Sequence, residues 1–190
     1  MKILSEEPKS ARDRILKTAH NLFYREGLQA VGIDRIIEEA GVAKMTFYRH
    51  FPSKNDLIAT FLKERHRAWM VWLAQEVEAR QAVTHGGIEV IADILEEWFH
   101  DPIFIGCAFI NSVAEVHNYD SEVMKLAETH VAEMLEFLEK LLTNDHVADP
   151  KAAAEEAFLV IEGAIVRAHM SHDPSAAKVC RRLLRKIAGL

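Results

Sequence analysis

The sequence of 190 residues is poor in the residues on which β architecture depends, with only eight glycines and five prolines. It contains no run of β-branched residues bounded by turn signals, which is the pattern that indicates strands. Apolar residues make up 49% and charged residues 27%, as in ordinary soluble globular proteins. We therefore predict an all-α chain with one or two domains.

Cysteine is scarce as well, because Cys107 and Cys180 are the only two. Two isolated thiols provide neither a disulfide framework nor a cluster of zinc ligands. Residues 1–9 lack the apolar segment of a secretory signal peptide, and no apolar run reaches the ~18 residues that span a bilayer. We expect a cytoplasmic protein with reduced thiols, no cofactor and no association with membranes.

The common catalytic motifs are also missing. The chain has no glycine-rich phosphate loop, no Gly-x-Ser-x-Gly elbow and no zinc signature. His169, His172 and Asp173 have a spacing that metal ligands use, but two histidines at a helix end are frequent by chance and no third partner is visible. We predict neither an enzyme nor a metal site.

Positive charge is in the minority, with 23 Lys and Arg against 29 Asp and Glu and a net charge of −6. This balance excludes a protein that coats nucleic acids. The distribution is uneven, however, because residues 1–60 contain ten Lys and Arg against eight Asp and Glu, and the rest of the chain contains 13 against 21. Only the N-terminal part is therefore suited to a small positive face for DNA.

That N-terminal part contains the most informative stretch, residues 33–51. Its apolar residues recur with the spacing of one buried helix face, and Gly41 follows where a helix favours a left-handed residue. A second short helix is predicted over residues 44–50, with mostly donors and cations at its exposed positions. Helix, glycine turn and helix form the helix-turn-helix pattern, whose second helix enters the major groove of DNA. A generic helical hairpin shares the apolar spacing, but not this composition.

The segment Phe47-Tyr48-x-x-Phe51-x-Ser53-Lys54 combines aromatic spacing, a turn and a basic helix start. With Gly27, Ile33, Ile36, Ala40-Gly41-Val42, Lys44 and Thr46, it resembles the N-terminal domain of TetR-family transcriptional regulators. The resemblance is close over residues 10–60 and rests on helical pattern and length beyond them. It implies a homodimer that binds a palindromic operator and leaves it when a small molecule binds the C-terminal domain.

This resemblance and the helical pattern predict two domains. Residues 1–60 form a three-helix DNA-binding domain, and residues 61–190 form a helical ligand-binding and dimerisation domain, with about nine helices in all. A long fourth helix starts at residues 52–56 and links the two domains. The later helices are expected at residues 88–99, 104–111, 122–142, 153–172 and 174–188.

The resemblance also assigns roles within the second short helix. Thr46, Tyr48, His50 and Lys54 correspond to phosphate-contacting positions, which fix the register without reading sequence. Lys44, Met45 and Arg49 are the candidates for base edges, because cations donate to guanine and an apolar side chain can pack on a thymine methyl.

Two departures from the family pattern concern helix caps. Val31-Gly32 and Ala43 stand where relatives often have Ser or Thr, so two side-chain caps worth ~1 kcal/mol each are missing. We expect packing to hold these helices, and the contacts to phosphates to shift onto Thr46, Tyr48, His50 and Lys54.

The effector site is expected among apolar residues of the second domain, and the best ligand is an apolar or amphipathic small molecule. Asn111 and His169 stand out, since a polar group on an apolar segment needs a partner. The candidates are Trp69, Trp72, Trp98, Phe99, Phe104, Cys107, Phe109, Asn111, Phe137 and His169, although core packing explains most of them.

The last two helices, within residues 150–190, are the predicted homodimer surface. The stripe that suggests it, shared with the core of the protomer, comprises Ala157, Val160, Ile161, Ala164, Ile165 and Ala168.

Two other functions are compatible with the sequence. Cys107 follows Gly106 near a predicted helix start, where a thiolate is favoured, which suggests a redox or electrophile sensor. A buried structural cysteine explains the same residue. A helical protein-interaction module without DNA binding is the second alternative.

Overall fold

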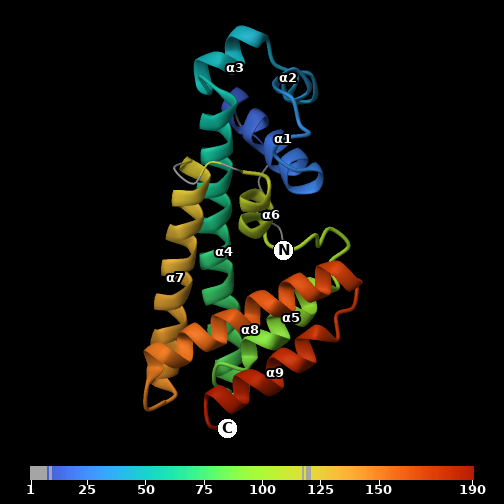
Figure 1. Cartoon of the computed structure of the whole chain (residues 1–190). Coiled ribbons are helices and arrows are strands. Elements are labelled where there is room, and N and C mark those ends of the chain that lie inside the picture. The colour runs from blue at the N-terminus through green and yellow to red at the C-terminus, as the bar shows by residue number, and fades with distance from the viewer. Residues whose placement is uncertain (1–7, 9, 117, 119–120) are drawn as a thin grey trace. The chain divides into compact units, whose positions relative to one another are not determined.

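The computed structural model describes residue 8 and residues 10–116, 118 and 121–190 (Figure 1). This described part contains nine helices and no strand, which confirms the predicted all-α fold. In chain order the helices are α1 (Ala11–Glu26), α2 (Ile33–Ala40), α3 (Lys44–His50), α4 (Lys54–Thr84), α5 (Val90–Phe99), α6 (Ala108–Ala114), α7 (Glu122–Asn144), α8 (Pro150–Ser171) and α9 (Ala176–Ile187).

One helix is shorter than the sequence predicts. Residues 104–107 are not helical, and α6 begins only at Ala108. Gly106 has a φ of 83°, a left-handed conformation that residues with side chains rarely adopt. A Cβ atom on Gly106 would lie 2.8 Å from Nδ1 of His169. The first turn of the predicted helix is therefore absent, because the chain passes α8 where only glycine fits.

Contacts divide the chain into two compact units, which we call the headpiece and the body. The headpiece comprises Lys2–Ala68 and Ala108–Glu128, and the body comprises Trp69–Cys107 and Thr129–Leu190. α4 and α7 contribute residues to both units. α6 groups with the headpiece although it follows α5 of the body, and the division at residue 60 stays a prediction from sequence.

The headpiece is built on the buried faces of its helices. α1 starts with a capping box, since the Asp13 N–H donates to Ser10 Oγ (3.1 Å) and the Ser10 N–H donates to the Asp13 carboxylate (3.0 Å). α1 packs against both α2 and α3. The largest fully buried side chains are Ile15, Leu28, Ile36, Phe47, Phe51, Leu57, Phe61 and Leu62.

A buried polar contact joins α1 to α4 inside the headpiece. Arg65 Nη1 lies 3.4 Å from His20 Nε2, and both side chains are buried. The guanidinium also stacks 3.6 Å from the ring centroid of Tyr24, and the His20 ring meets Phe61 edge-on. Burial, followed by the charge of Arg65, lowers the pKa of His20 from 6.5 to about 3. His20 is thus neutral at pH 7, the form that accepts a hydrogen bond from the guanidinium.

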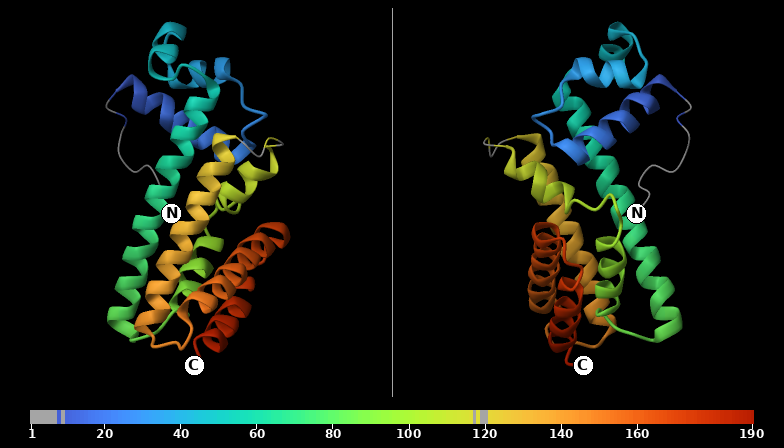
Figure 2. Two further views of the ribbon diagram at one scale, coloured as in Figure 1. Left: turned by 60° about the vertical axis from the view of Figure 1, so that its left-hand side comes forward. Right: turned by 90° about the vertical axis from the view of Figure 1, so that its right-hand side faces the viewer.

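The body packs α5, α8 and α9 against one another, and buried residues of α4 and α7 complete its core. α8 and α9 lie side by side in both views of Figure 2, and Arg181 of α9 forms an ion pair with Asp93 of α5. The stripe predicted to be shared between core and dimer surface is almost all core. Its buried members are Ala157, Ile161, Ala164, Ile165 and Ala168. Any dimer surface on α8 must therefore use a different face.

The substitution His20→Gln should reduce the acid sensitivity of the protein. Between pH 6.5 and 3 the unfolded chain binds a proton at His20 that the folded protein does not, so stability falls as the pH is lowered through this window. From pH 7 to 4.5 the wild type should lose about 2 kcal/mol more of its unfolding free energy than the variant, which cannot take up this proton. Urea unfolding at both pH values measures the difference, and equal losses in the two proteins would contradict the assignment.

Candidate DNA interface

The turn between α2 and α3 has the geometry that the sequence predicts. α2 ends at Gly41, which adopts a left-handed conformation with φ 61° and ψ 45°. The Gly41 N–H donates to the carbonyl of Glu38 (3.1 Å) and the Val42 N–H to that of Ile37 (3.2 Å), which closes the helix end. α3 then starts at Lys44, so only three residues separate the two helices.

The two missing caps are confirmed. Gly32 before α2 and Ala43 before α3 make no side-chain hydrogen bond to their helices. Phe47 holds α3 instead, because its ring is fully buried and its centroid lies 6.2 Å from that of the Phe51 ring. α3 is therefore fixed from one side by apolar packing, and its other side remains open.

That open side carries most of the predicted DNA-binding residues. Lys44, Met45, Tyr48 and Arg49 are exposed, and the spacing of four residues between the two pairs puts them on one face. Met45 is 87% exposed, and the Tyr48 ring stands edge-on to that of Phe47, 5.3 Å between centroids.

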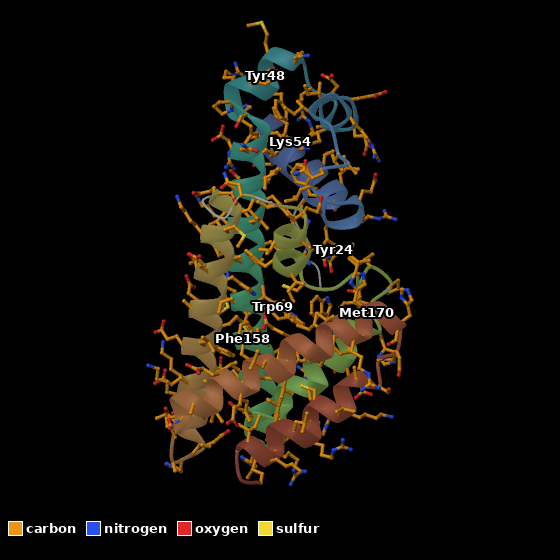
Figure 3. The ribbon with its side chains drawn as sticks, in the orientation of Figure 1. Tyr24, Tyr48, Lys54, Trp69, Phe158 and Met170 are labelled. Carbon is orange, nitrogen blue, oxygen red and sulfur yellow. The ribbon has the colours of Figure 1, made fainter. Side chains whose placement is uncertain are left out.

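Thr46 and His50, in contrast, are half-buried and flank this face of α3. α3 thus contains six of the seven residues predicted to bind DNA. Tyr48, one of the six, is labelled in Figure 3.

The seventh, Lys54, is the first residue of α4 (Figure 3). Ser53 caps this helix, because the Asp56 N–H donates to Ser53 Oγ (3.1 Å). Lys54 is half-buried; burial lowers its pKa, and the negative charge of Glu115 opposes this effect. A helix start and a cation placed together suit a phosphate oxygen.

Carboxylates near the turn engage several cations of the headpiece. The exposed Asp34 forms an ion pair with Lys44, with 3.3 Å between Oδ1 and Nζ. Arg35 donates to Glu26 (2.5 Å) and to Glu39 (2.8 Å). The candidate base-reading Lys44 therefore has an acidic neighbour that the sequence reasoning missed, since Asp34 lies ten residues earlier on another helix.

Two arginines of α1 are also held within the headpiece. The Arg12 guanidinium lies 5.4 Å from the Phe51 ring centroid, and Arg14 Nε donates to the carbonyl of Ala40 (3.3 Å). Arg14 thereby contacts the end of α2, and Arg12 contacts the residue that follows α3.

Comparison with known proteins agrees with this geometry. A sequence model described as "Bacterial regulatory proteins, tetR family" matches residues 15–60. The crystal structure of SCO4454, a TetR-family transcriptional regulator from Streptomyces coelicolor, has a TM-score of 0.82 and 30% sequence identity, with 94% of each chain covered. The chain belongs to the TetR family of transcriptional regulators. It is accordingly a DNA-binding regulator and not an enzyme.

Curated relatives are described as HTH-type transcriptional regulators. An HTH-type transcriptional regulator in the lacX 3′ region of Lactococcus lactis is 22% identical over 173 residues, which are 87% of this chain and 86% of that protein. An HTH-type transcriptional regulator of Staphylococcus aureus is 41% identical over 54 residues, 28% of this chain and 29% of its own. Neither alternative function, the thiol sensor or the interaction module, is favoured by these relatives.

The candidate effector residues of this TetR-family protein fall into two groups. Six form a continuous series of ring contacts within the body, with centroid distances from 4.8 Å (Trp69 to Trp98, and Trp98 to Phe104) to 6.2 Å (Phe104 to His169). The six are Trp69, Trp72, Trp98, Phe99, Phe104 and His169.

The other candidates are Cys107, Phe109, Asn111 and Phe137, of which Cys107 and Phe137 pack against the same core of the body. Cys107 and Phe137 are half-buried residues of the body. Phe109 and Asn111 belong to α6 of the headpiece, where Phe109 is buried with its ring 6.2 Å from that of His66.

The two thiols differ in environment. Cys180 is buried, and burial raises the pKa of its thiol to about 12, so it behaves as an apolar core residue. Cys107 is half-buried. Within the described residues, no three His, Cys, Asp or Glu side chains are placed to hold a metal ion, and no helix is long and apolar enough to cross a membrane.

The substitution Asp34→Asn should strengthen binding to duplexes of any sequence about threefold at low salt. It removes a carboxylate that repels phosphates and frees Lys44 to displace a counterion, so the salt dependence should become steeper. Fluorescence anisotropy with two unrelated duplexes measures both effects. Glu78→Gln, which removes the same charge from the body, is the control, and an equal gain there would show that Asp34 has no local role.

Proposed function

We propose that this protein is a ligand-responsive repressor that binds a palindromic operator as a homodimer. The observation that carries the proposal is the exposed face of α3, which presents Lys44, Met45, Tyr48 and Arg49 from a helix fixed by a buried phenylalanine. Rigid presentation of donors and cations on a short helix is what reading the major groove requires. Repression follows from occupancy of the operator.

Within this interface we assign two kinds of contact. Lys44, Met45 and Arg49 read base edges. The phosphate contacts, which set register, come from Thr46, Tyr48, His50 and Lys54. The three base-reading residues are all exposed, whereas the phosphate-contacting residues include the half-buried ones. This is expected when base-reading side chains extend furthest from the protein.

A second copy of the chain fits the outer face of α8. Leu159 is 70% exposed, Met170 is 80% exposed, and Val166 lies between them on the same stripe. Gly163 belongs to this stripe as well, and a Cβ atom there would meet nothing within 4 Å. An exposed apolar stripe with a glycine at its middle allows two helices to approach closely, and a two-fold axis makes it self-complementary. Residues 150–190 thereby hold two headpieces for the two half-sites.

The effector we propose is an apolar or amphipathic small molecule that contacts the aromatic series of the body. Series members Trp72, Phe104 and His169 are only half-buried, so their rings remain partly available. Release requires that the effector bind the DNA-free arrangement more tightly than the DNA-bound one. The continuous helix α4, which contributes to both units, transmits the change.

Selection of bound sites from random duplex DNA tests the operator-binding proposal. We expect a palindrome for the wild type. Lys54→Ala should weaken binding to all duplexes about equally, because a phosphate contact carries no sequence information. Met45→Gly should relax one position in each half-site at a cost of about 1–3 kcal/mol there. A wild type without sequence preference, or a Lys54→Ala protein with a changed preference, would be inconsistent with these roles.

Leu159→Glu tests the proposed dimer surface. A charge buried at a close helix contact should weaken self-association at least about tenfold, and weaken operator binding with it. Analytical ultracentrifugation over a concentration series measures the association. Val83→Glu is the matched control, since Val83 is 80% exposed near the end of α4 and should leave the dimer intact. A dimer that tolerates Leu159→Glu would rule out this face of α8.

A further inference from the structure

The loop between α1 and α2 takes its hydrogen bonds from a distant part of the chain. The N–H groups of Leu28 and Gln29 follow the end of α1, where backbone donors need partners outside the helix. Glu115, directly after α6, supplies both: the Leu28 N–H donates to its Oε1 (3.0 Å) and the Gln29 N–H to its Oε2 (2.7 Å). Two bonds to one charged acceptor make a strong bidentate contact within the headpiece.

The backbone is shaped to admit this carboxylate. Gly27, the C-cap of α1, has a φ of 91°, and a Cβ atom on it would lie 2.8 Å from Oε1 and 3.0 Å from Oε2 of Glu115. Any side chain at this position would displace the carboxylate. Glycine is therefore required both for the backbone conformation and for the space that Glu115 occupies.

The same loop determines where α2 begins. Leu28 and Val31 of this loop are buried in the headpiece. α2 starts directly after Gly32 and has no side-chain cap. Since α2 is only eight residues long, it cannot fix its own position. The contact with Glu115 holds the loop that precedes α2, and α2 leads through the Gly41 turn to α3.

Glu115 also affects a candidate DNA contact directly. Its negative charge favours the charged form of Lys54, the half-buried lysine at the start of α4. One carboxylate thus faces both the loop that leads to α2 and a lysine assigned to the phosphate backbone.

We infer that Glu115 is a positioning residue for operator recognition: it holds the α1–α2 loop, and through it α2 and α3, in the arrangement that binds DNA. This role rests on the proposed operator-binding function. The Glu115 N–H donates to the carbonyl of Ser112 in α6 (3.2 Å), so the carboxylate is tied to that helix.

The test compares Glu115→Ala and Glu115→Asp with the wild type on its selected operator and on an unrelated duplex. Removal of a negative charge from the headpiece would by itself tighten DNA binding. We expect the opposite for Glu115→Ala, whose operator dissociation constant should rise about tenfold. This is the effect of a variant in which only about a tenth of the molecules hold the headpiece in the DNA-binding arrangement. Glu115→Asp keeps the charge but shortens the reach, so it should weaken operator binding as well. Binding to the unrelated duplex should not weaken.

Glu122→Gln is the control, because Glu122 is an exposed carboxylate of the headpiece that pairs with Lys63. It should bind both duplexes as the wild type does or slightly more tightly. Amide hydrogen exchange at Leu28 and Gln29 should be faster in both Glu115 variants and unchanged in the control. Thermal unfolding of each variant shows whether it is folded, and if Glu115→Ala is not, Glu115→Asp decides the question.

The outcomes are distinct. Operator affinity of both Glu115 variants equal to that of Glu122→Gln, with wild-type exchange at the loop, overturns the inference while the proposed function stands. A wild type that selects no operator overturns the proposed function, and the role of Glu115 falls with it.

Discussion

A helix of seven residues is too short to be stable in water by itself, and the proposed DNA-binding face of this protein depends on one. α3 has no side-chain cap at its start, so its own hydrogen bonds cannot hold it. The burial of Phe47 against Phe51 provides what the helix lacks, because it fixes the helix at its centre and turns the cations and hydroxyls outward. Everything proposed for operator recognition depends on that apolar contact.

The electrostatics of the chain complement this arrangement. The protein is acidic overall, and even in the headpiece carboxylates engage several cations, as Asp34 does with Lys44 and as Glu26 and Glu39 do with Arg35. Non-specific affinity for DNA grows with the number of free cations that meet phosphates. A small open face in an acidic protein therefore favours binding that depends on fit, and it makes two headpieces on one operator more effective than one.

α8 has apolar residues on two faces. Its inner face is buried within the protomer, where Ala157 and Ile161 belong to the core. Leu159 and Met170 on its outer face are exposed (Figure 3 labels Met170). Apolar residues occur on both sides of this helix, so periodicity in the sequence could not distinguish its core face from its exposed face. Only the packing of α8 against α5 and α9 shows which of its faces remains exposed.

The sequence by itself determined the helical class, the helix-turn-helix with its left-handed Gly41, the two missing caps and the residues of the open face of α3, since all of these depend on spacing within one or two helical turns. Contacts between residues far apart in the chain were decided only by the tertiary structure. Asp34 meets Lys44 across the turn, His20 is kept neutral by burial beside Arg65, and Gly106 shortens α6 because it lies against His169. Glu115 reaches the loop after α1 from 87 residues away, and no local pattern marks a carboxylate whose partners are two backbone N–H groups.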